Sequence, residues 1–424
     1  MFQAGFSQVE ITPPAGTKKG GWMADLEARQ FLDPLYARVA CFVGSNEKKA
    51  AVVQLDLLSL SNRNVQRCRN LLARRFHVSG DQIMICATHN HAGPAAARLA
   101  PVDCQEEYVK TLLERIAAAF ALAQSQLQAA ELGLGVSREY EVGFNRRTLL
   151  RNGTVRTQAM HSQNPDALCQ EGPADPEFAL LLCRDLQGKP LGCLANFACH
   201  PTHHGGSDEI SAGFPGVLAH LAATQSGIPV CLFINGAYGN IITVDFVRGI
   251  SLSKEEAGTR LHAALERARL NMEWHSDVPV ESMNQRLSLK LRSISDAEYH
   301  GKVPGAQRFR SDELYEQEID HILMKEKKQP SQVIKLQVLR LGPACFAAVP
   351  GEYFNEYQLR IKMACYPRRV FVAGGSNGML GYIPTREAFQ HGGYETTLGP
   401  PSRMAPETGD KIAAALIGMM KKIY

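Results

Sequence analysis

In the first third of the chain, segments with an apolar residue at every third or fourth position alternate with short continuous apolar runs. Residues 62–76 and 106–122 carry apolar side chains every three to four positions, which predicts two amphipathic helices. Short apolar runs that predict strands lie at residues 4–12, 36–43, 50–55 and 83–85. The alternation of strand and helix favours an α/β fold made of layered mixed sheets flanked by helices.

The same two patterns predict further strands and helices in the rest of the chain. Further strands are predicted at residues 131–141, 178–183, 191–199, 230–234, 278–294, 333–341, 344–349 and 369–373. Further helices are predicted at residues 214–225, 253–271, 354–363 and 406–420. Residues 148–173 are polar and irregular, which predicts a long loop. The charged segment at about 296–330 is expected to be a peripheral helical insertion in one catalytic domain that spans residues 1–424.

Composition narrows the class of protein. Hydrophobic residues make up 45% of the 424 residues and charged residues 21%, as in ordinary globular enzymes. The formal charge of +4 is spread out, so we expect no nucleic-acid partner. No apolar run is long enough to span a bilayer, and the N-terminus lacks the pattern of a signal peptide. With eleven cysteines, several of them in apolar runs, this predicts a cytoplasmic protein with buried free thiols.

Histidines and a carboxylate follow several of the predicted strands. The strand at residues 83–85 leads into Thr-His-Asn-His-Ala-Gly-Pro, where His89 and His91 would face one side of an extended chain. His200 follows the strand at 191–199, and Glu352 follows the strand at 344–349. Neutral imidazole and carboxylate suit a catalytic zinc, although the wide spacing also allows histidines in ordinary turns.

Two further features remain open at this stage. Asp56 ends the strand at residues 50–55 and is a candidate partner for a metal-binding histidine, or a simple cap of the backbone. The glycine-rich segment 16–23 could bring the backbone close to a ligand, or serve only as a connection.

Six ordered motifs resemble the neutral/alkaline, non-lysosomal ceramidase family. They are Thr-His-Asn-His-Ala-Gly-Pro at 88–94, Phe-Asn-Arg at 144–146, His-Pro-Thr at 200–202, Pro-Gly-Glu at 350–352, Tyr-Ile-Pro-Thr-Arg-Glu at 382–387, and Tyr394 twelve residues after Tyr382. Together they cover nearly the whole chain in order, which makes the resemblance far more specific than any single motif.

The resemblance implies the fold of the ceramidase catalytic domain and a zinc-dependent amidase. His89, His200, Glu352 and Tyr382 would hold one Zn²⁺, and a zinc-bound water would attack the carbonyl of a small-molecule or lipid-like amide. His91 would carry the proton to the leaving amine. The oxyanion would be bound by Arg146 and Tyr394, with Tyr382 beside them.

The chain also departs from the family. Family members are secreted or membrane-associated and carry a further immunoglobulin-like domain, of which this sequence shows no sign. Where the family has Gly-Asp-Val-Ser-Pro-Asn, residues 239–244 read Gly-Asn-Ile-Ile-Thr-Val. A surface that gathers lipid is not evident. We therefore expect this protein to share the zinc chemistry of the family more than its substrate, ceramide. A polar amide, an ester or a lactone is the alternative substrate.

Other chemistries compete with this interpretation. Gly-Gly-Ser-Asn-Gly at 374–378 fits the motif of a serine hydrolase with Ser376 as nucleophile, but Gly381 and Pro384 oppose the helix that must follow. A two-metal phosphoesterase needs bridging carboxylates, and only Asp56 and Asp208 lie near the histidine motifs. A structural zinc site would have no use for Arg146, His91 or Tyr394. The pattern specifies no oligomeric state.

Overall fold

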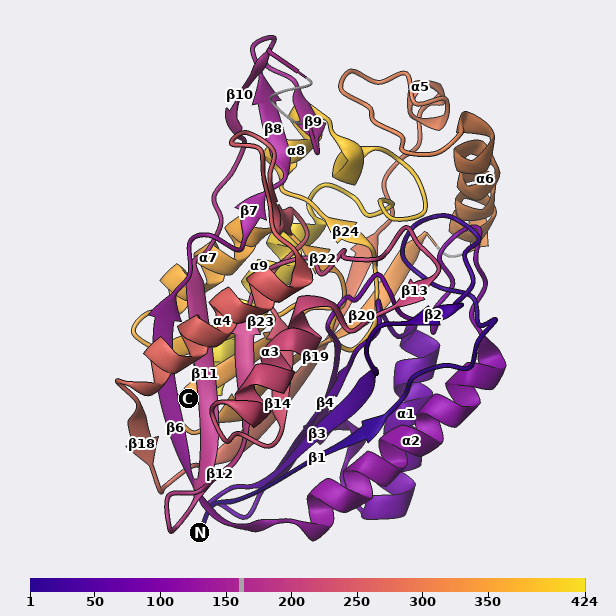
Figure 1. Ribbon diagram of the computed structural model, residues 1–424. Helices are drawn as coiled ribbons and strands as arrows, with labels where there is room; N and C mark the ends of the chain where they lie inside the picture. The colour runs from indigo at the N-terminus through magenta and orange to yellow at the C-terminus, as the bar shows by residue number, and fades with distance from the viewer. Residues whose placement is uncertain (160–163, 329, 424) are drawn as a thin grey trace.

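Two β-sheets pack face to face at the centre of the molecule, and helices cover their outer faces (Figure 1). The computed structural model describes residues 1–159, 164–328 and 330–423. This arrangement confirms the predicted class of layered mixed sheets flanked by helices.

The larger sheet has nine strands in the order β14-β12-β11-β6-β1-β3-β4-β5, with β18 also paired to β6. In chain order these strands are β1 (Gln3–Glu10), β3 (Tyr36–Val43), β4 (Lys49–Leu55), β5 (Ile83–Ala87), β6 (Gln128–Arg138), β11 (Glu177–Asp185), β12 (Pro190–Phe197), β14 (Cys231–Asn235) and β18 (Glu273–His275). The pairs β4–β5 and β12–β14 are parallel, and the other pairs are antiparallel.

The second sheet has the order β19-β20-β21-β23, and only its last pair is parallel. Its strands are β19 (Val280–Lys290), β20 (Ser331–Leu341), β21 (Ala344–Ala348) and β23 (Arg369–Ala373).

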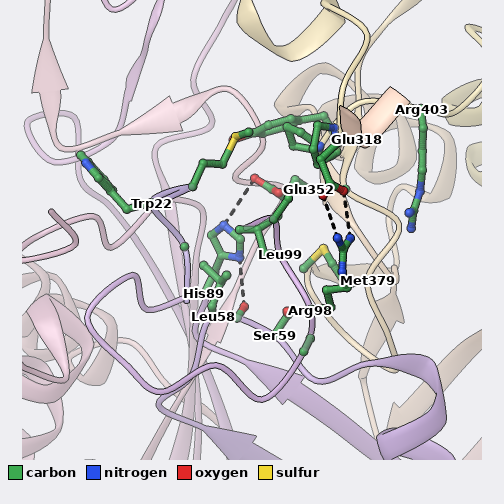
Figure 2. A pocket seen from close by; sticks show the side chains of 18 of the residues that line it. Trp22, Leu58, Ser59, His89, Arg98, Leu99, Glu318, Glu352, Met379 and Arg403 are labelled. Carbon is green, nitrogen blue, oxygen red and sulfur yellow. Dashed lines mark hydrogen bonds and ion pairs between the residues drawn. The ribbon is translucent and has the colours of Figure 1, made fainter. Parts of the chain in front are cut away.

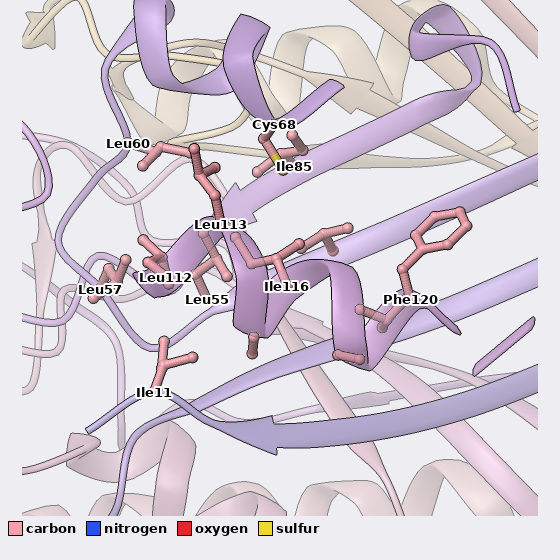
Figure 3. Packing of buried hydrophobic residues seen from close by; sticks show 14 of the residues in the cluster. Ile11, Leu55, Leu57, Leu60, Cys68, Ile85, Leu112, Leu113, Ile116 and Phe120 are labelled. Carbon is pink, nitrogen blue, oxygen red and sulfur yellow. The ribbon is translucent and has the colours of Figure 1, made fainter. Parts of the chain in front are cut away.

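The helices separate into two outer layers. On the larger sheet lie α1 (Asn62–Phe76), α2 (Glu106–Ser125), α3 (Gly213–Thr224) and α4 (Lys254–Arg269), and on the second sheet lie α7 (Asn355–Cys365) and α9 (Thr408–Lys422). Figure 3 shows Leu112, Ile116 and Phe120 of α2 packed in this outer core. The apolar periodicity of each helix therefore predicts the face that it buries.

Alternation along the strands explains why both faces of the sheets are apolar. In β3, Val39 and Cys41 pack under the helices, while Ala40 and Phe42 pack against the second sheet. Because successive side chains of a strand point to opposite faces, a strand between two layers must be apolar at nearly every position. This explains the continuous apolar runs in the sequence.

The larger sheet is strongly curved. Its strands β14 and β5 stand at opposite ends of the strand order, yet the side chain of Asn235 at the end of β14 donates to the carbonyl of Thr88 just after β5 (2.9 Å). The same amide donates to the carbonyl of Cys199 after β12 (2.8 Å). The curvature thus brings the two histidine motifs to one place.

Several short strands and helices complete the described chain. They are β2 (Gln30–Phe31), β7 (Phe144–Asn145), β8 (Arg147–Leu150), β9 (Val155–Thr157), β10 (Ala167–Gln170), β13 (Glu209–Ile210), β15 (Ile241–Ile242), β16 (Val244–Asp245), β17 (Ile250–Ser251), β22 (Glu352–Tyr353), β24 (Tyr382–Ile383), α5 (Asp296–Tyr299), α6 (Asp312–Lys328), α8 (Arg386–His391), and the 3₁₀ turns η1 (Gly80–Gln82) and η2 (Tyr394–Thr396).

Of two predictions about polar segments, one needs correction. Residues 148–173 are not simply a loop, because β8, β9 and β10 form a small three-stranded sheet there; residues 160–163 lie outside the described part. The insertion at about 296–330 is helical in α5 and α6, with residues 300–311 between them. It stands at the edge of the molecule in Figure 1, and its Phe309, Glu318 and Ile322 line the main cavity.

Two compositional expectations can also be compared with the structure. The cysteines are free thiols, and all are buried except Cys104, which is partly buried, and Cys169, which is exposed. No helix in the described ranges is long and apolar enough to cross a membrane.

Candidate metal centre

Three histidines from the two motifs converge in the interior. Ring nitrogens of His89, His91 and His200 come within 4.8 Å of one another, and all three side chains are buried. The ring centroid of His89 lies 4.9 Å from that of His91 and 4.9 Å from that of His200. A hydrogen bond from the backbone of His91 to the carbonyl of Pro201 (3.2 Å) ties the two motifs together. This cluster could hold a metal ion.

The convergence of His89 and His91 was predicted, but its cause was not. His89 has φ of 66°, in the left-handed region that non-glycine residues rarely adopt. The chain therefore turns at His89 instead of continuing as an extended strand. Asn90 fixes this turn, since its amide donates to the carbonyl of Ser211 (2.7 Å) and its oxygen accepts from the backbone of Ala92 (3.0 Å). Such strained positions are typical of functional sites.

Backbone carbonyls orient two of the three imidazoles. Nδ1 of His89 donates to the carbonyl of Leu58, and Nδ1 of His200 donates to the carbonyl of Ile241, both at 3.0 Å. Because a carbonyl can only accept, these contacts place the proton of a neutral ring on Nδ1 and leave the lone pair on Nε2. Neither ring nitrogen of His91 has a partner at good hydrogen-bond geometry, and the backbone of Gly21 approaches the ring.

Glu352 completes the cluster from β22, the short strand that follows β21 of the second sheet. Its Oε2 lies 3.1 Å from Nε2 of His200 and 3.3 Å from Nε2 of His89, as Figure 2 shows for the second contact. Two bare ring nitrogens and a carboxylate oxygen thus face one another with no proton to share. Three acceptors at this distance repel one another unless a cation lies among them, so the donor set fits a metal ion.

Tyr382 stands beside Glu352 in a short parallel ribbon. Strands β22 and β24 pair in the register Glu352 with Tyr382, and the Tyr382 ring centroid lies 6.4 Å from that of His200. The structure thus brings together all four residues that the resemblance assigns to a metal.

The charge states of these groups follow from burial and their neighbours. Burial lowers the pKa of His200 to about 4, and Arg146 adds to the effect. Burial alone would raise the pKa of Glu352, but positive charge on His89 and a hydrogen bond from His200 would hold that pKa well below its usual value, and a cation among the three groups acts in the same direction. Neutral histidines and an ionised carboxylate are the forms that bind metals.

Arg146 and Tyr394 lie next to this cluster. The Arg146 guanidinium sits 5.3 Å from the centroid of the Tyr382 ring, and its Nε donates to Glu395 (2.8 Å). Burial disfavours the charge of Arg146, yet Tyr382 and Glu395 together raise its pKa. The Tyr394 ring lies 5.7 Å from that of Tyr382, and burial raises the Tyr394 pKa well above its usual value. The pair therefore offers a fixed cation and a neutral hydroxyl donor.

The glycine-rich segment 16–23 lies against the ring of His91. Gly21 has φ of 114°, and a β-carbon there would lie 3.0 Å from Nδ1 of His91. Trp22 then packs edge-on against the His91 ring, with centroids 5.9 Å apart. Lys19 is buried and donates to the carbonyls of His204 (2.9 Å) and Ser207 (2.6 Å), which fastens the segment to the second motif.

A cavity of about 810 Å³ opens onto the cluster. Figure 2 shows Trp22 on one side of the His89–Glu352 pair and Arg403 on the other. His89, His91, Arg146, Glu352, Tyr382 and Tyr394 all line this cavity. Its size suits a small organic molecule.

Two sequence hypotheses fail at this site. Asp56 does not support a histidine, because its carboxylate accepts from Arg38 (2.8 Å) and from the backbone of Tyr36 (2.9 Å). Ser376 is fully buried, and its hydroxyl donates to the carbonyl of Gly374 (3.3 Å). The segment 374–378 pairs with the end of β5, with a bridge between Ser376 and Cys86, and no helix follows it.

Tyr238 and Glu395 are site residues that the sequence analysis missed. The Tyr238 ring lies 4.5 Å from that of His89 and 4.9 Å from that of His200. Its position in the loop that follows the predicted buried strand at 230–234 was the available signal. Glu395 gave no signal, because its partner Arg146 is 249 residues away.

No protein-family model matches the sequence, and no curated protein matches it significantly. Among solved structures, neutral ceramidase from Pseudomonas aeruginosa superposes with a TM-score of 0.75 at 17% identity, over 100% of this chain and 75% of that one. A ceramidase complexed with C2 gives the same TM-score at 18% identity, over 99% of this chain and 74% of that one. The chain has the neutral ceramidase fold.

The neutral ceramidase fold was the one implied by the sequence motifs. At these identities the likeness establishes the architecture, and the chemistry has to be argued from the residues of this chain. Those residues lie where the motifs place them, around the three histidines and Glu352.

A pH dependence of stability follows for the metal-free ceramidase-fold protein. The pKa of His200 is about 4 when folded and about 6.5 when unfolded. Between these values the unfolded chain binds more protons, so the folded state should lose up to about 3 kcal/mol as the pH falls from about 6.5 to 4. Urea unfolding of chelator-treated protein across this range measures the loss, which should be smaller in His200→Gln. A flat profile would contradict the assigned neutral imidazole.

Proposed function

We propose that this protein is a zinc-dependent amidase that hydrolyses an N-acyl bond. One observation carries the proposal: the bare Nε2 atoms of His89 and His200 lie 3.3 and 3.1 Å from one carboxylate oxygen of Glu352. Ligand atoms of a tetrahedral zinc with bonds of 2.0–2.1 Å stand about 3.3 Å apart. The spacing of these acceptors therefore suits zinc.

His89, His200, Glu352 and Tyr382 would hold the ion. A zinc ion in this place lowers the pKa of a water molecule toward neutrality and polarises a carbonyl. The anchored Nδ1 atoms of the two histidines support this role, because ligating imidazoles usually donate their other nitrogen to a carbonyl or carboxylate.

His91 is suited to moving a proton. Its ring lies beside both ligand histidines, has no hydrogen-bond partner and lines the cavity. Burial and the neighbouring His89 hold its pKa well below the usual value, so the ring is neutral at rest and can accept a proton at Nε2 or Nδ1. It can then deliver this proton to the nitrogen of the leaving amine.

Arg146 and Tyr394 would stabilise the oxyanion that develops as the carbonyl is attacked. Arg146 keeps its charge through Glu395, and Tyr394 keeps its proton because it is buried. Donors that are fixed before the reaction need no reorganisation during it. Glu395 acts here as a positioning residue, since it holds Arg146 and does not line the cavity.

The first experiment is elemental analysis of purified protein together with a screen of N-acyl substrates from polar to lipid. About one zinc per chain and chelator-sensitive release of an amine are expected. Esters and lactones belong in the same screen, because the same residues could cleave them and the cavity lining is partly polar. Protein without any metal would refute the proposal. We also propose a cytoplasmic location, which cell fractionation can test.

Ser376→Ala should leave amidase activity within about twofold of wild type. The Ser376 hydroxyl makes one hydrogen bond to a carbonyl, lies outside the cavity and is not followed by a helix. A serine-directed phosphonate should likewise have no effect, whereas a chelator should abolish turnover. Loss of activity in Ser376→Ala with a normal zinc content would restore the serine hydrolase.

A further inference from the structure

Positive charge dominates the cavity beyond the metal centre. Six cationic side chains among the described residues line it (Arg63, Arg98, Arg146, Arg310, Lys325 and Arg403), against two carboxylates, Glu318 and Glu352. Glu352 belongs to the histidine cluster. Glu318 is already paired with Arg98 in a two-point contact of 2.7 and 2.9 Å, drawn in Figure 2. The cavity thus carries cations that no carboxylate of its own lining neutralises.

Arg403 and Lys325 are the clearest of these unpaired cations. Neither makes an ion pair with any acid in the described part of the chain, and Nε of Arg403 is buried without a hydrogen-bond partner. Burial lowers the pKa of both groups, and the charge of Arg403 lowers that of Lys325 further. Arg403 is partly buried and Lys325 is exposed, and the two cations repel each other in the empty protein because no acid stands between them.

The fold holds these two cations in place. The backbone carbonyl of Arg403 accepts from the backbone of Arg292 (3.1 Å), and the next residue, Met404, bridges to Leu291 at the end of β19. Lys325 lies in the last turns of α6, in the insertion that was expected to be peripheral. Both residues also line a smaller cavity of about 230 Å³ that adjoins the first and shares Asn62, Ile322 and Gln332 with it.

We propose that Arg403 and Lys325 form a subsite for a carboxylate on the substrate, remote from the bond that is cleaved. The inference rests on the proposed amidase function and adds a substrate class to it: N-acyl compounds with an acidic end. Apolar side chains of Leu99, Ile322 and Met379 line the cavity together with these cations, so an aliphatic spacer between the amide and the acid suits its walls. Arginine binds a carboxylate with two parallel hydrogen bonds, which gives the contact direction as well as strength.

The test uses three amides that share one neutral frame. N-hexyloctanamide is the reference, N-octanoyl-6-aminohexanoate carries a carboxylate on the amine half, and the mono-hexylamide of octanedioic acid carries it on the acyl half. We expect wild-type kcat/KM to be at least about tenfold higher for one of the two acids than for the reference, a ratio typical of a buried charge-assisted contact. The preferred acid then tells which half of the substrate reaches the subsite.

Variants connect this preference to the two residues. Arg403→Gln and Lys325→Gln should each reduce the ratio of acid to neutral substrate by about fivefold or more, and Arg403→Lys should retain part of it. Arg286→Gln is the matched control, because Arg286 is exposed on β19 and does not line the cavity; it should leave the ratio unchanged. Lys325 is exposed on a helix, so its variant remains informative if an Arg403 variant fails to fold.

Calorimetric binding of the same three compounds separates the two proposals. If an acid binds about tenfold more tightly than the reference and Arg403→Gln removes the difference, the subsite is supported even where no amide is cleaved. If the amides are cleaved without preference, or the preference survives both glutamine variants, the subsite is refuted and the amidase stands. Equal binding of the three compounds, or none, also refutes the subsite.

Discussion

Glu352→Ala and His200→Ala should each lose the bound metal and lower kcat/KM by about a thousandfold or more. Each residue supplies one of the acceptors that converge 3.1 Å apart, and no other carboxylate lines this part of the cavity among the described residues. Removing either leaves only two strong donors from the His and Glu set, because burial raises the pKa of Tyr382 and keeps it a neutral phenol, which is a weak ligand. A catalytic zinc usually has three protein ligands. The loss of water activation then removes the main source of rate. Metal content and turnover should be measured on the same preparation.

Glu356→Gln is the control for Glu352. Glu356 is a nearby carboxylate that accepts from Asn240 (2.9 Å) and does not line the cavity. It should keep both metal and activity. Full metal content in Glu352→Ala would show that the ion is held elsewhere, and the ligand set would then be wrong. His89, His91 and His200 would then be the alternative set of metal ligands, without Glu352.

His91→Ala should keep its metal and lose about 10²–10⁴-fold in kcat, the range typical of a general acid–base. The imidazoles of His89 and His200 are fixed by backbone carbonyls, whereas that of His91 is not, so His91 can be removed without disturbing the ligands. The pH–rate profile should also lose one of its limbs. Elemental analysis and steady-state kinetics on one substrate measure both effects.

His203→Gln is the matched histidine control. Its Nε2 bonds the carbonyl of Leu252 (3.0 Å), and its ring does not line the cavity. It should resemble wild type in metal content and in turnover. Normal turnover in His91→Ala would exclude the proton-transfer role, and loss of metal in the same variant would make His91 a ligand.

The sequence by itself determined the layers and the chemical groups of this protein. Continuous apolar runs predicted strands buried on both faces, and three- to four-residue spacing predicted helices such as α1 and α2. These signals are local, because burial of a strand or helix face depends on neighbouring positions in the chain. The histidines and Glu352 stood at strand ends, where loops carry function on a rigid scaffold.

Only the tertiary structure decided how these groups meet. The curvature that joins β14 to the end of β5, the left-handed turn at His89 and the pairing of Arg146 with Glu395 depend on contacts between distant segments. The segment at 148–173 was misjudged because a polar sequence forms short strands only against a partner surface. The free energy of such contacts comes from packing and charge between residues that are far apart in the chain. The local spacing of apolar residues therefore does not predict them.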